Sequence, residues 1–165
     1  MKKTLLAAAF IAAMAPLAAF GQLDRDKLYV GGGVGWNSSG QLRGSGINAF
    51  LGHDLPELTA SYGIEEFVYS AEVGVFYTGT MTHPDRDISR WDGGIQASGV
   101  ASRGWHEVAP EVSLLLRLGL ATGQRTGLIW GLGTEYAIDR RLGGRLEYVS
   151  MAGHNSVRLG AAYRF

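Results

Sequence analysis

The sequence predicts an all-β fold, namely an eight-stranded antiparallel transmembrane up-and-down β-barrel. Three features indicate it: an apolar N-terminal segment of the kind that directs export, a two-residue alternation of apolar and polar side chains, and a final strand that ends in phenylalanine. A strand with one apolar and one polar face repeats every two residues. Small outer-membrane barrels consist of such strands, each of about ten residues.

The N-terminal segment has the parts of a secretory signal. Lys2 and Lys3 supply positive charge, an apolar run extends from Leu5 to Ala13, and small residues flank Phe20 just before Gln22. The run is too short to span a bilayer, which requires about 20 helical residues. We therefore expect residues 1–21 to be a signal peptide. Residues 22–165 then form one barrel domain in a Gram-negative outer membrane, reached through the secretory pathway.

The composition excludes several classes of protein. The chain has 15 basic and 15 acidic residues and no cysteine. Balanced charge offers no basic face for nucleic acid, and a chain without cysteine forms no disulfide or thiolate metal site. The glycine-rich run 31–35 lacks the G-x-G-x-x-G spacing of nucleotide-binding loops, and the histidines are scattered. We therefore expect no cofactor and no metal.

The alternation also fixes the number of strands. Eight segments of about ten residues fit the chain length and the even strand number of bacterial barrels; they are 28–37, 45–53, 67–79, 93–104, 111–121, 127–137, 143–151 and 156–165. The face pattern of the fourth changes near Gly99, which predicts a bulge. Periplasmic connections fall at 54–66, 105–110 and 138–142, and external connections at 38–44, 80–92, 122–126 and 152–155.

The apolar face of these strands is too continuous to be left to water. Leu114, Leu116, Leu118 and Leu120 share one face, whereas Arg117 lies on the other. Lipid around an apolar exterior, with small and charged residues inside, accounts for both faces. The alternative is a soluble lipocalin-like barrel whose apolar side chains point inward. Aromatic residues near the predicted strand ends supply two interfacial girdles; they are Trp36, Tyr77, Trp91 and Trp130 outside, and Tyr69, Trp105, Tyr136, Tyr163 and Phe165 inside.

The C-terminus resembles the closing strand by which the barrel assembly machinery recognises outer-membrane proteins. Gly160, Tyr163 and the terminal Phe165 carry this resemblance. We therefore expect three partners, namely the assembly machinery, outer-membrane lipid and lipopolysaccharide, and we expect the protein to be a monomer.

Several charged residues lie on the strand face opposite the apolar face, because they alternate with the apolar residues along each strand. Because charges in a medium of low dielectric must be paired, we expect them to form a network that fills the barrel interior. The set comprises Glu72, Arg117, Glu135, Arg145, Glu147 and Arg158.

Specific residues resemble the transmembrane domain of the OmpA family. The final three strands carry the closest likeness, through 133–138, 145–148 and 160–165; Tyr29-Val30-Gly31 resembles the opening strand, and Glu72-Val73-Gly74 and Arg117-Leu118-Gly119 resemble middle strands. The resemblance implies an eight-stranded barrel whose interior charges form a plug or a narrow gated pore. The family's interior acids fall on Glu72 and Glu135, and its gating arginine falls on Arg145. Arg103 is the nearest candidate for the family's interior lysine.

Three classes of function remain open at this stage. The first is a structural or narrow pore-like barrel that is not an enzyme, and the second is an adhesion or interaction barrel. The third is a lipid A-modifying hydrolase in which His154 and Ser156 act as base and nucleophile, with Glu147 or Glu135 orienting the histidine. The known deacylase pattern places its acid downstream, and no acid follows Ser156. The sequence therefore favours the first class.

Overall fold

A computed structural model describes residues 24–58, 66–105, 109–151 and 153–165. The expected signal peptide and the middle of the 54–66 connection lie outside these residues. In the described part of the chain, no helix has the length and apolar character needed to cross a membrane. The elements are η1 (Arg25–Lys27), β1 (Leu28–Ser39), β2 (Leu42–Asp54), β3 (Phe67–Tyr77), β4 (Met81–Thr82), β5 (Ser89–Arg90), β6 (Gly93–Gly104), β7 (Val112–Thr122), β8 (Gly127–Ala137), β9 (Leu142–Met151) and β10 (His154–Arg164).

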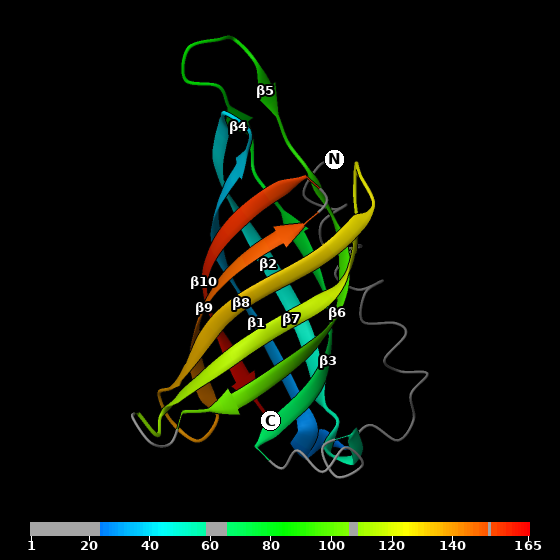
Figure 1. The fold of residues 1–165 in the computed structure, drawn as a ribbon, viewed down its shortest axis with the longest axis vertical. Helices are drawn as coiled ribbons and strands as arrows, with labels where there is room; N and C mark the ends of the chain where they lie inside the picture. Colours follow the sequence, from blue (N-terminus) through cyan, green and yellow to red (C-terminus); the bar gives the residue numbers. More distant parts are fainter. Residues whose placement is uncertain (1–23, 59–65, 106–108, 152) are drawn as a thin grey trace.

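The long strands close into an eight-stranded antiparallel barrel. Each pairs with its neighbours in the order β1-β2-β3-β6-β7-β8-β9-β10, and β1 pairs with β10 from Tyr29–Arg164 to Ser38–Asn155. Figure 1 shows these strands tilted steeply around a common axis. Closure leaves no long strand with an unpaired edge, which is the condition for β-structure in lipid. The predicted fold class and strand number are confirmed.

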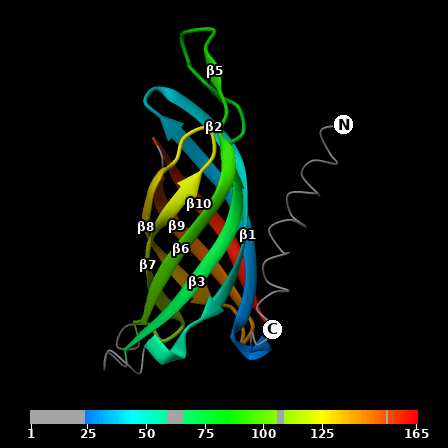
Figure 2. The same cartoon turned by 90° about the vertical axis from the view of Figure 1, so that its right-hand side faces the viewer.

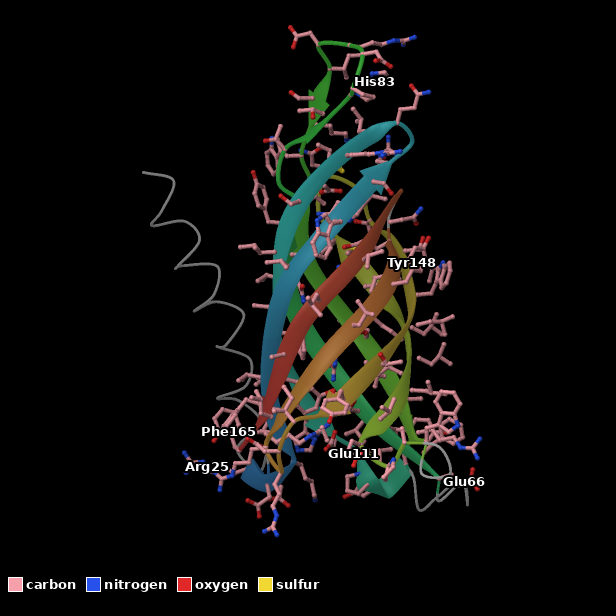
Figure 3. The ribbon with its side chains drawn as sticks, turned by 90° about the vertical axis from the view of Figure 1, so that its left-hand side faces the viewer. Arg25, Glu66, His83, Glu111, Tyr148 and Phe165 are labelled. Carbon is pink, nitrogen blue, oxygen red and sulfur yellow. The ribbon has the colours of Figure 1, made fainter. Side chains whose placement is uncertain are left out.

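The two ends of the barrel differ. We call one the terminal end, because Leu28 and Phe165 meet there through a 3.1 Å hydrogen bond from the Phe165 N–H to the Leu28 carbonyl. We call the other the hairpin end, because β4 and β5 extend there beyond the barrel (Figures 1 and 2). Figure 3 shows His83 at the hairpin end and Glu111 and Phe165 at the terminal end.

The turns follow from local side-chain chemistry. Between β8 and β9, Asp139 Oδ1 accepts backbone N–H groups of Arg141 at 2.7 Å and Leu142 at 2.8 Å. These two bonds hold the pKa of the exposed Asp139 carboxyl below its ordinary value, because they stabilise the carboxylate. Between β1 and β2, Gly40 adopts φ +61°, a conformation that favours glycine. Both connections are therefore tight.

Two details of the predicted strands are wrong. The connection expected at 38–44 is only a turn, because β1 and β2 continue pairing as far as Ser39 and Leu42. The expected bulge near Gly99 is absent, because β6 pairs residue by residue with both β3 and β7. Small residues in the middle of β6 weaken the visible alternation without interrupting the ladder.

The outer surface is apolar. Leu118 is 64% exposed and Leu128 is 67% exposed, although both belong to long strands of the barrel wall. Figure 3 shows side chains projecting outward from the part of the wall seen in that view, Tyr148 among them. The apolar faces therefore point outward, and the soluble lipocalin-like alternative is wrong. The predicted girdle aromatics are exposed apart from Tyr69, which is partly buried.

Replacing Leu116 with arginine tests this assignment of faces. Leu116 is exposed midway along β7. A cation at the centre of the lipid face costs about 2–4 kcal/mol, so Leu116→Arg should reduce the fraction of protein that folds in membranes. The measurement is the compact, heat-modifiable gel band of unboiled outer membranes, with Leu116→Ile as the matched control. A normal folded fraction for Leu116→Arg would mean that this face does not meet lipid.

Candidate functional site in the barrel lumen

The candidate site is a chain of ion pairs that runs through the lumen. Alternate residues of each strand point inward, so one polar residue from each of several strands reaches the barrel axis. Acids and arginines alternate along this chain; from the terminal end inward they are Asp54, Arg164, Glu135, Arg145, Glu72, Arg117 and Glu147. Each arginine in the series bridges two carboxylates.

Arg117 is the most deeply buried arginine of the ion-pair chain. Its side chain is 1% exposed. Its Nε donates to Glu147 Oε1 at 3.1 Å, and its Nη2 lies 3.0 and 3.2 Å from the two Glu147 oxygens. Its Nη1 donates to Ser98 Oγ at 2.7 Å and forms an ion pair with Glu72 Oε2 at the same distance, outside hydrogen-bond alignment. One guanidinium therefore joins β3, β6 and β9 to its own strand, β7.

Arg145 continues the chain toward the terminal end. Its Nη1 donates to Glu72 Oε1 at 2.6 Å, and its Nε and Nη2 donate to Glu135 Oε2 at 3.0 and 2.7 Å. The guanidinium lies 4.9 Å from the centre of the Phe50 ring, within cation–π range. A Cβ at Gly31 would lie 2.3 Å from Phe50 Cζ, so glycine at this position makes room for the ring.

The terminal end of the chain contains residues that the sequence analysis missed. Arg164 pairs with Asp54 at 3.0 Å and with Glu135 at 3.2 Å. Tyr29 donates its hydroxyl to Glu72 at 2.9 Å. Arg164 has the inward parity of β10, so the alternation was sufficient to find it. Asp54 fell outside the predicted strand 45–53, and tyrosine carries no charge that would mark it as a member.

Apolar clusters lie on both sides of the ion-pair chain. Tyr29, Phe50 and Ala162 form one toward the terminal end. The other lies toward the hairpin end and contains Phe76, Ala121, Ile129, Val149 and Met151. The buried part of the network, from Arg145 to Glu147, is thus packed beside apolar side chains, which strengthens its electrostatic interactions, whereas Asp54 and Arg164 are partly exposed.

Arg103 does not lie in the lumen, contrary to the expectation from the resemblance. Its side chain is 51% exposed, forms an ion pair with Glu66 and lies over the Phe67 ring. Odd-numbered residues of β6 point outward, and the continuous register of that strand keeps Arg103 on that face. The lysine position of the OmpA family therefore has no counterpart at Arg103.

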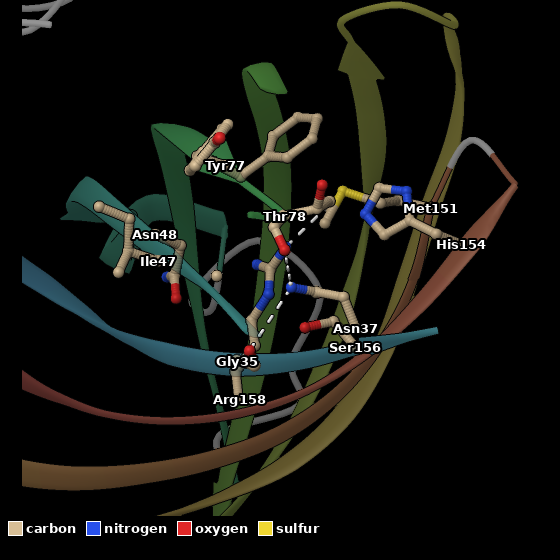
Figure 4. Close-up of a pocket in the computed structure, with 12 residues that line it drawn as sticks. Gly35, Asn37, Ile47, Asn48, Tyr77, Thr78, Met151, His154, Ser156 and Arg158 are labelled. Atoms are coloured by element: carbon tan, nitrogen blue, oxygen red, sulfur yellow. Dashed lines mark hydrogen bonds between the residues drawn. The ribbon is translucent and has the colours of Figure 1, made fainter. Parts of the chain in front are cut away.

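The half of the lumen near the hairpin end has a different character. Arg158 is 5% exposed there, and its hydrogen-bond partners are the neutral Gln96 and Met151. Beside it is a pocket with room for about one water-sized molecule, whose lining includes Asn37, Thr78, His154 and Ser156 (Figure 4). Within the described residues, no group of three histidine or acidic side chains could hold a metal ion.

His154 and Ser156 do not form the arrangement expected of a hydrolase. Nε2 of His154 is buried without a hydrogen-bond partner. Glu135 and Glu147, the acids considered for orienting the histidine, bind arginines instead. Both His154 and Ser156 are buried inside the barrel, whereas a membrane lipid meets its outer face.

The residues of the expected assembly signal lie along the seam where the barrel closes. Gly160 pairs with Gly33 of β1. Tyr163 and Phe165 are exposed at the terminal end, where their rings pack edge to face at 5.7 Å. Both rings are accessible on the outer surface.

Comparison with known proteins supports the fold alone. No model of a protein family matches the chain, and no curated protein sequence matches it. Among solved structures, Neisserial surface protein A is similar with a TM-score of 0.53 and 14% identity, over 84% of this chain and 97% of the other.

Two further structures are similar in the same way. Ail, the attachment invasion locus protein of Yersinia pestis, solved with the heparin analogue sucrose octasulfate, has a TM-score of 0.52 and 14% identity, over 84% of this chain and 96% of its own. A de novo designed transmembrane β-barrel has a TM-score of 0.52 and 17% identity, over 86% and 98%. These small barrels share the architecture, and the likeness to the OmpA family in particular stays a prediction.

Arg117 provides a test of the network. Arg117→Met should lower the free energy of unfolding by about 3–5 kcal/mol, because it leaves two buried carboxylates without their partner. Arg103→Met is the matched control and should cost no more than about 1 kcal/mol, since it removes an exposed ion pair. Urea unfolding in lipid vesicles measures both variants. Equal losses would show that the lumen pairs contribute no more than a surface pair.

Proposed function

We propose that this chain is a structural outer-membrane barrel with a sealed lumen, and that it is not an enzyme. The observation that carries the proposal is the continuous chain of ion pairs across the interior. Arg117 alone contacts Glu72, Ser98 and Glu147, which leaves its guanidinium no freedom to swing aside without breaking several contacts. Because each displaced charge would lose its partner in a medium of low dielectric, the closed arrangement is strongly preferred.

The proposal includes a location and partners. The apolar wall and the similarity to outer-membrane barrels support the outer membrane, with the terminal end facing the periplasm and the hairpin end outside. The exposed Tyr163 and Phe165 support recognition by the barrel assembly machinery, and the wall would contact lipid and lipopolysaccharide. Because every long strand is already paired on both sides, the barrel needs no second copy to close.

Conductance in planar lipid bilayers tests the sealed lumen. The wild-type barrel should give no steady current, because ion pairs occupy its centre. The double variant Arg117→Ala/Glu147→Ala removes a bonded pair together and should produce a measurable conductance. Arg103→Ala, which changes only the outer surface, should remain silent. A wild-type current as large as that of the double variant would contradict the proposal and favour a pore.

A second candidate function is interaction at the cell surface. The connection that contains β4 and β5 extends past the barrel rim (Figure 2) and exposes Ile88 at 50%. Its base is rigid, because the Thr78 hydroxyl accepts the Asp92 N–H at 2.8 Å and donates to the Asp92 carbonyl at 3.0 Å. A firmly held projection with an exposed apolar side chain is suited to binding a partner.

Replacing residues 83–88 with a short glycine-serine turn tests this second function. Bacteria that display the wild-type barrel should adhere to cultured animal cells better than bacteria that display the shortened form. The heat-modifiable band should be unchanged, since the connection lies outside the barrel wall. A substitution of the 123–126 connection is the control. Equal adherence of the wild type and the shortened form would remove this candidate.

A further inference from the structure

The half of the lumen near the hairpin end contains a buried cation without a carboxylate partner. Arg158 has no Asp or Glu within ion-pair distance in the described part of the chain, whereas the lumen arginines Arg117, Arg145 and Arg164 each have two. Its two side-chain hydrogen bonds are to Gln96 Oε1 at 3.2 Å and to Met151 Sδ at 3.6 Å. Neither partner carries charge, so the cation is not neutralised locally.

Two buried acids of the barrel, Glu147 and Asp92, already hold other partners. Glu147 is the residue opposite Arg158 in the β9–β10 ladder, but both of its carboxylate oxygens accept hydrogen bonds from Arg117. Asp92, the buried acid of the hairpin end, uses Oδ1 to accept the backbone N–H groups of Gly93 and Gln124 at 2.8 and 2.9 Å. A rotation of Arg158 toward Glu147 would therefore compete with Arg117 for the same oxygens.

Further unpartnered polar atoms lie beside this cation. Nε2 of Gln96 is buried and donates to nothing, although the same amide accepts a hydrogen bond from Arg158 through its oxygen. Nε2 of His154 is also buried and unpartnered, and His154 and Arg158 line the same pocket (Figure 4). Buried polar atoms without partners are rare in native proteins, because each costs desolvation free energy.

The pocket has the size and charge for a small anion. The centre of a water-sized molecule can occupy only about 10 Å³ there, so the pocket holds about one such molecule and is too small for a sugar or a lipid headgroup. No acidic side chain is among the residues that line it. Arg158 supplies the positive charge, and the unpartnered Nε2 of His154, which also lines the pocket, supplies a donor when it carries the ring proton.

We propose that a small inorganic anion of the size of chloride binds in this pocket as the counter-ion of Arg158. The anion would accept hydrogen bonds from the Arg158 guanidinium and from unpartnered donors beside it. The anion would neutralise Arg158, the lumen arginine that no carboxylate of the ion-pair chain binds. The pocket lining includes Met151 and His154, which lie at strand ends of the hairpin end, so the anion would enter from that side.

Bromide, a heavier analogue of chloride, tests occupancy directly. Crystals of the wild-type barrel soaked in sodium bromide should show an anomalous peak within about 3.5 Å of an Arg158 nitrogen. A soaked crystal that diffracts well and shows no peak there would overturn the proposal. This measurement requires no variant, so it does not depend on whether a substituted barrel folds.

Chloride-dependent stability provides the second measurement. A ligand that binds only the folded state lowers the unfolding equilibrium constant in proportion to its concentration once that exceeds the dissociation constant. Replacing gluconate by chloride at constant ionic strength should therefore lower the unfolding equilibrium constant about tenfold for each tenfold rise in chloride. Arg158→Gln should abolish the dependence, and Arg103→Gln should retain it. Equal dependence in the wild type and Arg158→Gln would overturn the proposal, whereas a conducting wild type would affect only the sealed-lumen proposal.

Discussion

A barrel in lipid must pair every backbone N–H and C=O group within its own wall, and the other features of this structure depend on that constraint. The pairing of β1 with β10 satisfies it, because it leaves no strand edge open. Closure in turn divides the side chains of each strand strictly between outside and inside. Arg117 and Leu116 are adjacent in sequence, yet one is buried at the centre of the lumen and the other faces lipid.

The division of faces creates an electrostatic problem in the lumen. An eight-stranded barrel is narrow enough for side chains to fill it, so its interior charges lie close together and far from water. Acidic and basic side chains alternate along the ion-pair chain from Asp54 to Glu147, so each interior charge has a neighbour of opposite sign. Glycines make the geometry possible: a Cβ at Gly52 would lie 2.1 Å from the Tyr29 ring, whose hydroxyl binds Glu72.

Much of the fold could be predicted from alternation alone, because the two-residue repeat of apolar and polar side chains is visible in the sequence. Strands 93–104 and 127–137 agree with the structure to the residue. Parity also indicated which charges point inward, but it does not say at what height along the axis each one lies. Strand tilt sets that height, so the partners of Arg117 required the three-dimensional structure. The outward position of Arg103 required the continuous register of β6, because the small residues of that strand obscure its parity in the sequence. Asp54 was missed because polar strand ends carry little alternation.

The two halves of the lumen differ because the acids are unevenly distributed along the axis. Seen from Glu72, the acids Asp54 and Glu135 lie toward the terminal end, where Arg145 and Arg164 have carboxylates on both sides. Toward the hairpin end, Glu147 is fully used by Arg117, so the next arginine has no protein anion left to bind. An apolar residue at position 158 would avoid that deficit. Arginine there is consistent with a barrel that draws a counter-ion from solution, because a mobile anion can neutralise the charge without a further carboxylate in the wall.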